Sequence, residues 1–309
     1  MKQTAKYIAR AVLFAALLVA ILAALAPVFR PKYLTGGVPS TMEGDLDYLV
    51  WGDSEGWTAV APMQLWRDHG FSGYNCSTVG QRLQEDYYDL EDILTTRHPK
   101  VILMETNMLY GSHGVVGETE KFAQSLTGRI LPTYRYHDRW KQLLAGDSTA
   151  TERDIYRGNH YVTIVQPYTR GDYTQPTDAV DNIPTAQQIY LDQIVALCKK
   201  QGIELILFRA PSPDFWTYAR HNGLTQYAES RDITYIDFNL MLEELNIDWN
   251  TDALDGGDHL NASGTAKLTA WMGDYLASRD LLPDHRGEAG YETWDEDLVQ
   301  YEQIISQSQ

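Results

Sequence analysis

Five short apolar runs, separated by segments with helical periodicity, most strongly limit how this chain can fold. They lie at Tyr48–Trp51, Gly73–Cys76, Lys100–Glu105, Ile203–Phe208 and Thr234–Asp237. Apolar runs that alternate with helices are typical of a parallel sheet whose two faces are covered by helices. The sequence therefore predicts an α/β fold, a three-layer α/β/α sandwich around a sheet of about five parallel strands.

Composition shifts along the chain predict its domain organisation. Residues 1–30 are a short cytoplasmic tip followed by an apolar segment, and residues 31–44, rich in Pro, Gly, Ser and Thr, are a linker. The α/β body takes up residues 45–282, and residues 283–309 form an acidic tail. Within the body, residues from about 112 to 181 lose their periodicity, which indicates an insertion.

The apolar segment near the amino terminus predicts a single membrane span. Residues Ala11–Phe29 carry no charge, and a helix of this length roughly matches a hydrocarbon core of about 30 Å. Basic residues precede it, so we expect a cytoplasmic amino terminus and a body on the extracytoplasmic side of the cell membrane. The alternative is a cleaved secretory signal, which the small residues at Ala24-Leu25-Ala26 would allow and Pro27 disfavours.

Charge and cysteine content exclude several classes of protein. The formal net charge of -17 argues against a nucleic-acid partner, because binding to phosphates requires clustered Lys and Arg. Cys76 and Cys198 are too few for a disulfide scaffold, and the histidines lack the spacing of a zinc site. We therefore expect no nucleic-acid partner, no metal and no cofactor.

A serine and a late Asp/His pair provide the parts of a nucleophilic catalyst. The first apolar run ends in Gly52-Asp53-Ser54, and His259 follows two acidic residues, Asp255 and Asp258. A serine hydroxyl becomes a good nucleophile when an imidazole accepts its proton and a carboxylate orients that imidazole. Either acidic residue could orient His259; Asp255 is favoured because the two intervening glycines let the chain turn back.

Two further strand ends could supply an oxyanion hole. Ligands of an open parallel sheet collect at the carboxyl ends of its strands. Gly80 follows the second apolar run and is expected to open a helix over residues Gly80–Thr96, whose amino terminus would face a developing negative charge. Asn107 follows the third run and would offer a side-chain amide donor at the same edge.

This combination of residues resembles the SGNH, or GDSL, hydrolase family, whose fold is flavodoxin-like. The resemblance covers the chain from about Asp47 to Ala277. It implies that Ser54 is the nucleophile, that His259 is the general base, and that the Ser54 N–H, the Gly80 N–H and the Asn107 amide form the oxyanion hole. One position departs from the family pattern, which places the carboxylate three residues before the histidine, where this chain has Gly256.

The chain is more closely similar to the membrane-anchored branch of that family, which includes the D-alanine transfer protein and envelope O-acyltransferases. The residues that carry this likeness are Pro62-Met63-Gln64-Leu65-Trp66, Tyr74-Asn75, Gln81, Pro99-Lys100, His259-Leu260-Asn261 and Gly264. The likeness implies a serine esterase or O-acyltransferase that forms an acyl-enzyme on Ser54. Its substrate would be an acylated cell-envelope glycan or polymer, with a membrane acyl-transfer protein as a possible partner.

Candidate substrate-binding residues and two rival functions complete the prediction. Arg209 ends the fourth apolar run, where a guanidinium could bind a carboxylate or phosphate in a bidentate manner. Trp57 and Tyr110 are the other candidates for substrate contact. The rival functions are a non-catalytic accessory or binding protein of an envelope-modification complex, and a lipase or thioesterase.

Overall fold

The chain divides into two compact units in the computed structural model. The described residues are 2–29, 34–35, 38–39, 42–111, scattered positions between 123 and 144, and 154–308. One unit consists of Met1–Leu34 with His113–Glu152, and the other of Thr35–Ser112 with Arg153–Gln309. The insertion expected at about 112–181 therefore lies partly outside the described residues, and the domain boundaries stay a prediction.

The first unit contains a long apolar helix, α1 (Lys2–Phe29), and a short helix, α7 (Arg139–Leu144). Within the described ranges, α1 is the one helix that is long and apolar enough to cross a membrane, with a mean hydropathy of 2.8 over its most apolar window. A secretory signal near the amino terminus would pass the same test. The side of the membrane on which the second unit lies stays a prediction.

The second unit is built on a five-stranded sheet in which every neighbouring pair of strands is parallel. Its order is β4-β3-β5-β6-β7, for strands β3 (Tyr48–Trp51), β4 (Gly73–Asn75), β5 (Val101–Glu105), β6 (Glu204–Arg209) and β7 (Thr234–Asp237). The strand order reverses between β3 and β5, and ligands of open α/β sheets bind in the crevice at such a point. The predicted α/β fold with a parallel sheet is confirmed.

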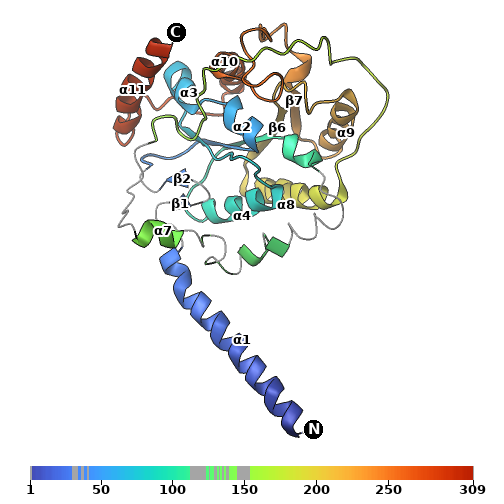
Figure 1. Ribbon diagram of the computed structural model, residues 1–309. Coiled ribbons are helices and arrows are strands. Elements are labelled where there is room, and N and C mark those ends of the chain that lie inside the picture. The colour runs from blue at the N-terminus through green and yellow to red at the C-terminus, as the bar shows by residue number, and fades with distance from the viewer. Residues whose placement is uncertain are drawn as a thin grey trace. The chain divides into compact units, whose positions relative to one another are not determined.

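Helices cover this sheet on both faces (Figure 1). They are α2 (Ser54–Ala59), α3 (Pro62–His69), α4 (Leu83–Ile93), α8 (Thr185–Gln201), α9 (Tyr218–Glu229), α10 (Ala262–Ser278) and α11 (Glu292–Ser308). Two short 3₁₀ helices, η1 (Asn107–Tyr110) and η2 (Phe238–Leu240), follow β5 and β7, and β1 (Leu34–Thr35) pairs with β2 (Val38–Pro39) in a separate small sheet.

The strands alternate their side chains between two apolar cores, as the geometry of a strand requires. On β5, Ile102 and Met104 join the core that contains buried residues of α4 and α8. Val101 and Leu103 join the other core, which contains Leu268 and other buried residues of α10. Because both faces of each strand are buried, the strands appear in the sequence as continuous apolar runs.

The start of the helix expected at Gly80 differs from the structure. Helix α4 begins at Leu83, and Arg82 is its N-cap residue. Gly80 has a φ of +68° and is exposed in the turn that precedes the helix. This left-handed conformation is accessible to glycine and ends regular right-handed structure, so Gly80 lies outside the helix.

The carboxyl-terminal helix α11 packs on the body of the second unit. Trp294 is fully buried and its ring centroid lies 5.1 Å from that of Trp66 on α3. The Trp294 indole N–H donates to the carbonyl of Glu43 at 3.2 Å, and the Arg157 guanidinium lies 4.4 Å from the Trp294 ring. The acidic tail thus contributes a large aromatic side chain to the core.

Replacing Trp294 by Ala is expected to lower the free energy of unfolding by about 3–5 kcal/mol, because it leaves a cavity in a close-packed core. Urea denaturation of the full chain in detergent, followed by tryptophan fluorescence and circular dichroism, measures the change. Val299→Ala on the exposed side of the same helix is the control and should change stability by less than about 0.5 kcal/mol. Equal effects of the two variants would contradict the packing of α11.

Candidate active site

Ser54 is the first residue of α2 and follows the carboxyl end of β3. Asp53 is the N-cap residue of this helix, and its Oδ1 accepts a hydrogen bond from the Glu55 N–H at 3.1 Å. The Ser54 side chain is partly exposed. The strand, the cap and the helix start therefore hold Ser54 at the carboxyl end of β3, beside the point where the strand order reverses between β3 and β5.

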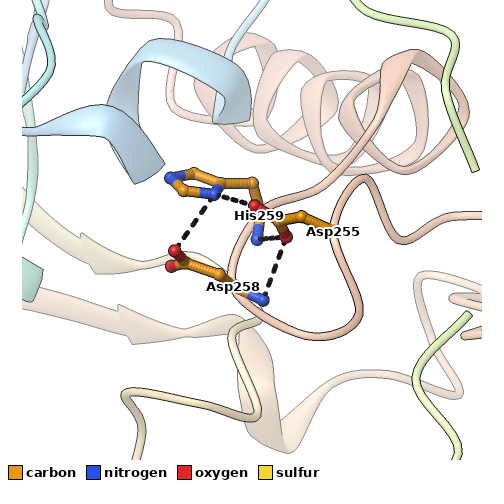
Figure 2. A group of neighbouring side chains, drawn as sticks. All are labelled: Asp255, Asp258 and His259. Atoms are coloured by element: carbon orange, nitrogen blue, oxygen red, sulfur yellow. Dashed lines mark hydrogen bonds and ion pairs between the residues drawn. The ribbon is translucent and has the colours of Figure 1, made fainter. Parts of the chain in front are cut away.

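His259 is held by Asp255 through both its side chain and its backbone. Asp255 Oδ2 lies 2.6 Å from His259 Nδ1, and Asp255 Oδ1 accepts from the backbone N–H of His259 at 2.9 Å (Figure 2). Asp258 Oδ2 is farther from the same Nδ1, at 3.3 Å. Gly256 and Gly257 have φ values of +85° and +129°, which let the loop turn back on itself. The geometry thus matches Asp255 as the residue that orients the imidazole.

An extended segment of residues 159–168, here called the strap, holds the loop that carries His259. The Gln166 N–H donates to the Ala253 carbonyl at 3.0 Å, and the Gly256 N–H donates to the Gln166 carbonyl at 3.0 Å. Beyond the loop, the Ala262 N–H donates to the Val162 carbonyl at 2.7 Å. These bonds on both sides of His259 limit the positions that the loop can take.

The second ring nitrogen of His259 is free to act on a ligand. His259 Nε2 is buried and has no hydrogen-bond partner among the described residues. At the start of α2, burial raises the pKa of Asp53, and the charge of Arg209, the hydrogen bond from Asn107 and the charge of His259 partly offset this rise. Within the described residues no hydrogen bond joins Ser54 Oγ to Nε2, so their pairing stays a prediction.

Of the two other predicted oxyanion donors, Asn107 lies beside the Ser54 turn. Its Nδ2 donates to Asp53 Oδ2 at 3.0 Å, and its backbone N–H donates to Glu105 Oε2 at 2.7 Å. Among the described residues, the second hydrogen of the Nδ2 amide has no acceptor, so it could bind a ligand. The exposed turn at Gly80 has the helix start three residues later, so the expected stabilisation by a helix amino terminus at Gly80 is wrong. Its N–H as an oxyanion donor remains a prediction.

Arg209 pairs with two acidic residues at the carboxyl end of the sheet. The side chain is buried, and its guanidinium pairs with the carboxylates of Glu55 and Glu105, at 2.7 Å from Glu105 Oε1. Ser212 Oγ also donates to Glu55, at 3.1 Å. Three of the five N–H donors of Arg209 thus join the ends of β5 and β6 to the start of α2, which is a structural role that the sequence did not predict. Contact between Arg209 and substrate stays a prediction.

The carboxyl groups around Arg209 exceed its single positive charge. Burial raises the pKa of Glu105 well above its usual range, and the nearby charge of Asp53 raises it further. Burial also lowers the pKa of Arg209 to about 10, against the opposing effect of Asp53. Neither Glu55 nor Glu105 was recognised from the sequence, although a Glu that ends an apolar run, as Glu105 does, is an available signal.

The other two predicted substrate contacts, Trp57 and Tyr110, lie against different parts of the chain. The Trp57 ring stacks on His160 of the strap, with ring centroids 3.9 Å apart and planes 13° apart. The Tyr110 hydroxyl contacts the carbonyls of Asp181 and Arg220, at 3.3 and 3.1 Å. Tyr110, Asn107 and Arg209 line a cavity of only about 10 Å³, which holds no more than a water molecule. Substrate contact by Trp57 and Tyr110 remains a prediction.

Asp255, Asp258 and His259 could also be considered as metal ligands. Among the described residues, they form the one group of three or more His, Cys, Asp or Glu side chains whose possible ligand atoms all lie within 4.8 Å of one another. However, the Nδ1 atom that such a metal would need already pairs with Asp255. Orientation of an imidazole explains this arrangement without an ion.

Comparison with known proteins gives matches among solved structures. No protein-family model matches the sequence, and a search of curated proteins gives no match. Among solved structures, a protein assigned to the G-D-S-L lipolytic family from Desulfitobacterium hafniense is 13% identical, with 74% of this chain and 99% of that chain covered and a TM-score of 0.41. TesA is 14% identical, with 76% and 99% covered and a TM-score of 0.40. A GDSL-like lipase from Bacteroides thetaiotaomicron is 12% identical, with 75% and 87% covered and a TM-score of 0.36.

Replacing Arg209 by Met is expected to lower the free energy of unfolding by about 3–5 kcal/mol, because buried carboxylates lose their partner. Arg279→Met is the control: it removes an exposed ion pair with Glu204 and should cost at most about 1 kcal/mol. Thermal and urea denaturation measure both variants. An unchanged stability of Arg209→Met would contradict the structural role.

Proposed function

We propose that the protein is a serine hydrolase or acyltransferase that acts on ester bonds through an acyl-enzyme on Ser54. The observation that carries this proposal is the Asp255–His259 pair, whose geometry leaves Nε2 buried and without a partner among the described residues. A buried nitrogen without a partner is costly in a fold and is common where a ligand completes the hydrogen bond. Catalytic hydrogen bonds are often long before substrate binds, so the present lack of a bond to Ser54 Oγ is compatible with this role.

In the proposed mechanism, His259 transfers one proton in each half of the reaction. Ser54 Oγ attacks the ester carbonyl carbon while Nε2 accepts the hydroxyl proton, and Asp255 stabilises the resulting imidazolium. The tetrahedral intermediate collapses, the bond to the leaving oxygen breaks, and Nε2 returns the proton to that oxygen. A water molecule or an acceptor hydroxyl then repeats these steps on the acyl-enzyme, which gives hydrolysis or transfer.

The backbone at Ser54 and the Asn107 amide would stabilise the negative charge that develops on the carbonyl oxygen. The Ser54 N–H lies at the start of α2, and the Asn107 amide is fixed by Asp53, so two donors are positioned before the reaction begins. Donors that need no reorganisation stabilise a transition state most effectively. Gly80 is proposed as a third donor on the basis of its family position.

For the substrate, we propose an acylated glycan or polymer of the cell envelope. This rests on the likeness of the sequence motifs to the membrane-anchored branch and on α1, which is long and apolar enough to tether the second unit to a membrane. A membrane acyl-transfer protein would then supply or receive the acyl group. Transfer and hydrolysis differ only in the acceptor that reaches the acyl-enzyme.

A fluorophosphonate probe is expected to label the full chain in detergent, because it reacts with an activated serine. Ser54→Ala should abolish labelling, whereas Ser278→Ala, which changes a serine at the far end of α10, should leave it unchanged. Gel fluorescence and mass spectrometry of the labelled peptide report the result. A native protein that takes up no label would contradict the proposal and favour a non-catalytic accessory protein.

Asp255→Asn is expected to reduce kcat for p-nitrophenyl acetate by about 10³–10⁴-fold, because the imidazole loses its orienting carboxylate. Asp258→Asn removes the more distant contact and should reduce kcat less than about tenfold. Steady-state kinetics of both variants separate the two carboxylates. Equally mild losses would show that a Ser54–His259 dyad suffices, and a larger loss for Asp258→Asn would reverse the assignment.

A further inference from the structure

A groove of about 530 Å³ lies along the strap. Successive side chains of an extended chain point to opposite sides, and Asn159, Tyr161, Thr163 and Val165 line the groove while His160 stacks on Trp57. Residues of α3, α10 and α11 form the other walls; these three helices lie together near the strap in Figure 1. The volume falls within the range of about 300–1,000 Å³ that is usual for ligand sites.

The lining combines apolar surface with uncharged hydrogen-bonding groups. Tyr161, Val165 and Ile305 supply aromatic and aliphatic surface, whereas Gln64 and Ser263 supply an amide and a hydroxyl. A fatty acyl chain would require a lining without these polar groups. A sugar ring presents both C–H faces and hydroxyls, and so matches a surface of this mixed kind.

The two cations of the groove are already paired. Arg67 Nε donates to Asp68 Oδ1 at 2.7 Å, and Lys267 Nζ donates to Asp252 Oδ2 at 2.6 Å. The whole chain also carries a formal net charge of -17. A polyanion would therefore meet no unpaired positive charge from these two side chains, and an uncharged chain of hydroxyl-bearing units fits better.

The strap connects the groove to the segments that carry the candidate catalytic residues. Asn261 and Ala262, which line it, follow His259 by two and three residues and bind the strap: the Asn261 amide donates to the Ile164 carbonyl at 3.2 Å. On the other side, Asn159 Nδ2 donates to the carbonyl of Trp57, three residues after Ser54, at 3.1 Å. A polymer held in the groove would thus lie against the strap, which hydrogen-bonds both α2, where Ser54 begins the helix, and the loop that carries His259.

We propose that this groove binds uncharged saccharide units of a polymer whose ester group reaches Ser54. The inference rests on the proposed function, and it adds a polymer-binding site beside the reacting residues. Small esters need only the catalytic residues, whereas a polymer would gain affinity from the groove. Occupying the groove should therefore impair polymer turnover selectively.

The test fills the groove with a bulky side chain. Ala266→Trp places an indole at an exposed position of α10 that lines the groove. The control, Ala277→Trp, places an indole at an exposed position of the same helix outside the groove. The substrates are an O-acetylated glucan and p-nitrophenyl acetate. Ala266→Trp and Tyr161→Ala should lower the ratio of kcat/KM for the glucan to that for the small ester by about tenfold or more, and Ala277→Trp should leave it unchanged.

A binding measurement tests the groove independently of catalysis. In affinity gel electrophoresis, Ser54→Ala should be retarded by the unmodified glucan, and the double variant with Ala266→Trp should lose this retardation. Equal glucan turnover or retardation with and without Ala266→Trp would contradict the proposal that the groove binds saccharide. Stronger retardation by carboxymethylated glucan would contradict the proposal that the bound units are uncharged. Small-ester hydrolysis that persists in Ser54→Ala would instead overturn the proposed function, which distinguishes the two failures.

Discussion

The ion pairs of Arg209 with Glu55 and Glu105 are the interaction on which the site depends. One guanidinium joins the residue after Ser54 to the last residue of β5, and it comes itself from the end of β6. Removing Arg209 would leave two buried carboxylates without their cation, so the side-chain link between the three strand ends depends on this one residue. With Asp53 included, three carboxyl groups surround one cation, and the raised pKa values of Glu105 and Asp53 allow a proton to offset the excess negative charge.

The fold could be predicted from the sequence because each strand is buried on both faces. Such strands appear as uninterrupted apolar runs, and their alternation with helices specifies a parallel sheet without knowledge of any contact. Helix starts were less predictable. The sequence predicts a helix start at Gly80, but this residue has a left-handed conformation and belongs to the turn before Leu83. Sequence periodicity does not report the sign of φ.

The site could be predicted only where neighbouring residues carry the information. Gly256 and Gly257 suggested that Asp255 could turn back to His259, and the observed Nδ1 contact agrees with that local argument. Arg209 shows the limit, because its position at a strand end was evident but its partners, 104 and 154 residues away, were not. The strap was missed for the same reason: it has no periodicity, and its order comes from hydrogen bonds to the distant loop around His259.

The packing of α11 on α3 delays the completion of the core until the end of synthesis. Trp294 donates to the carbonyl of Glu43 across 251 residues of sequence, and it covers Trp66 on α3. Contacts between such distant positions are slow to form, and they cannot form at all before the last helix has been synthesised. A nascent chain therefore carries an uncovered aromatic face on α3 through most of its synthesis, a period in which it is open to misassociation and to chaperone binding.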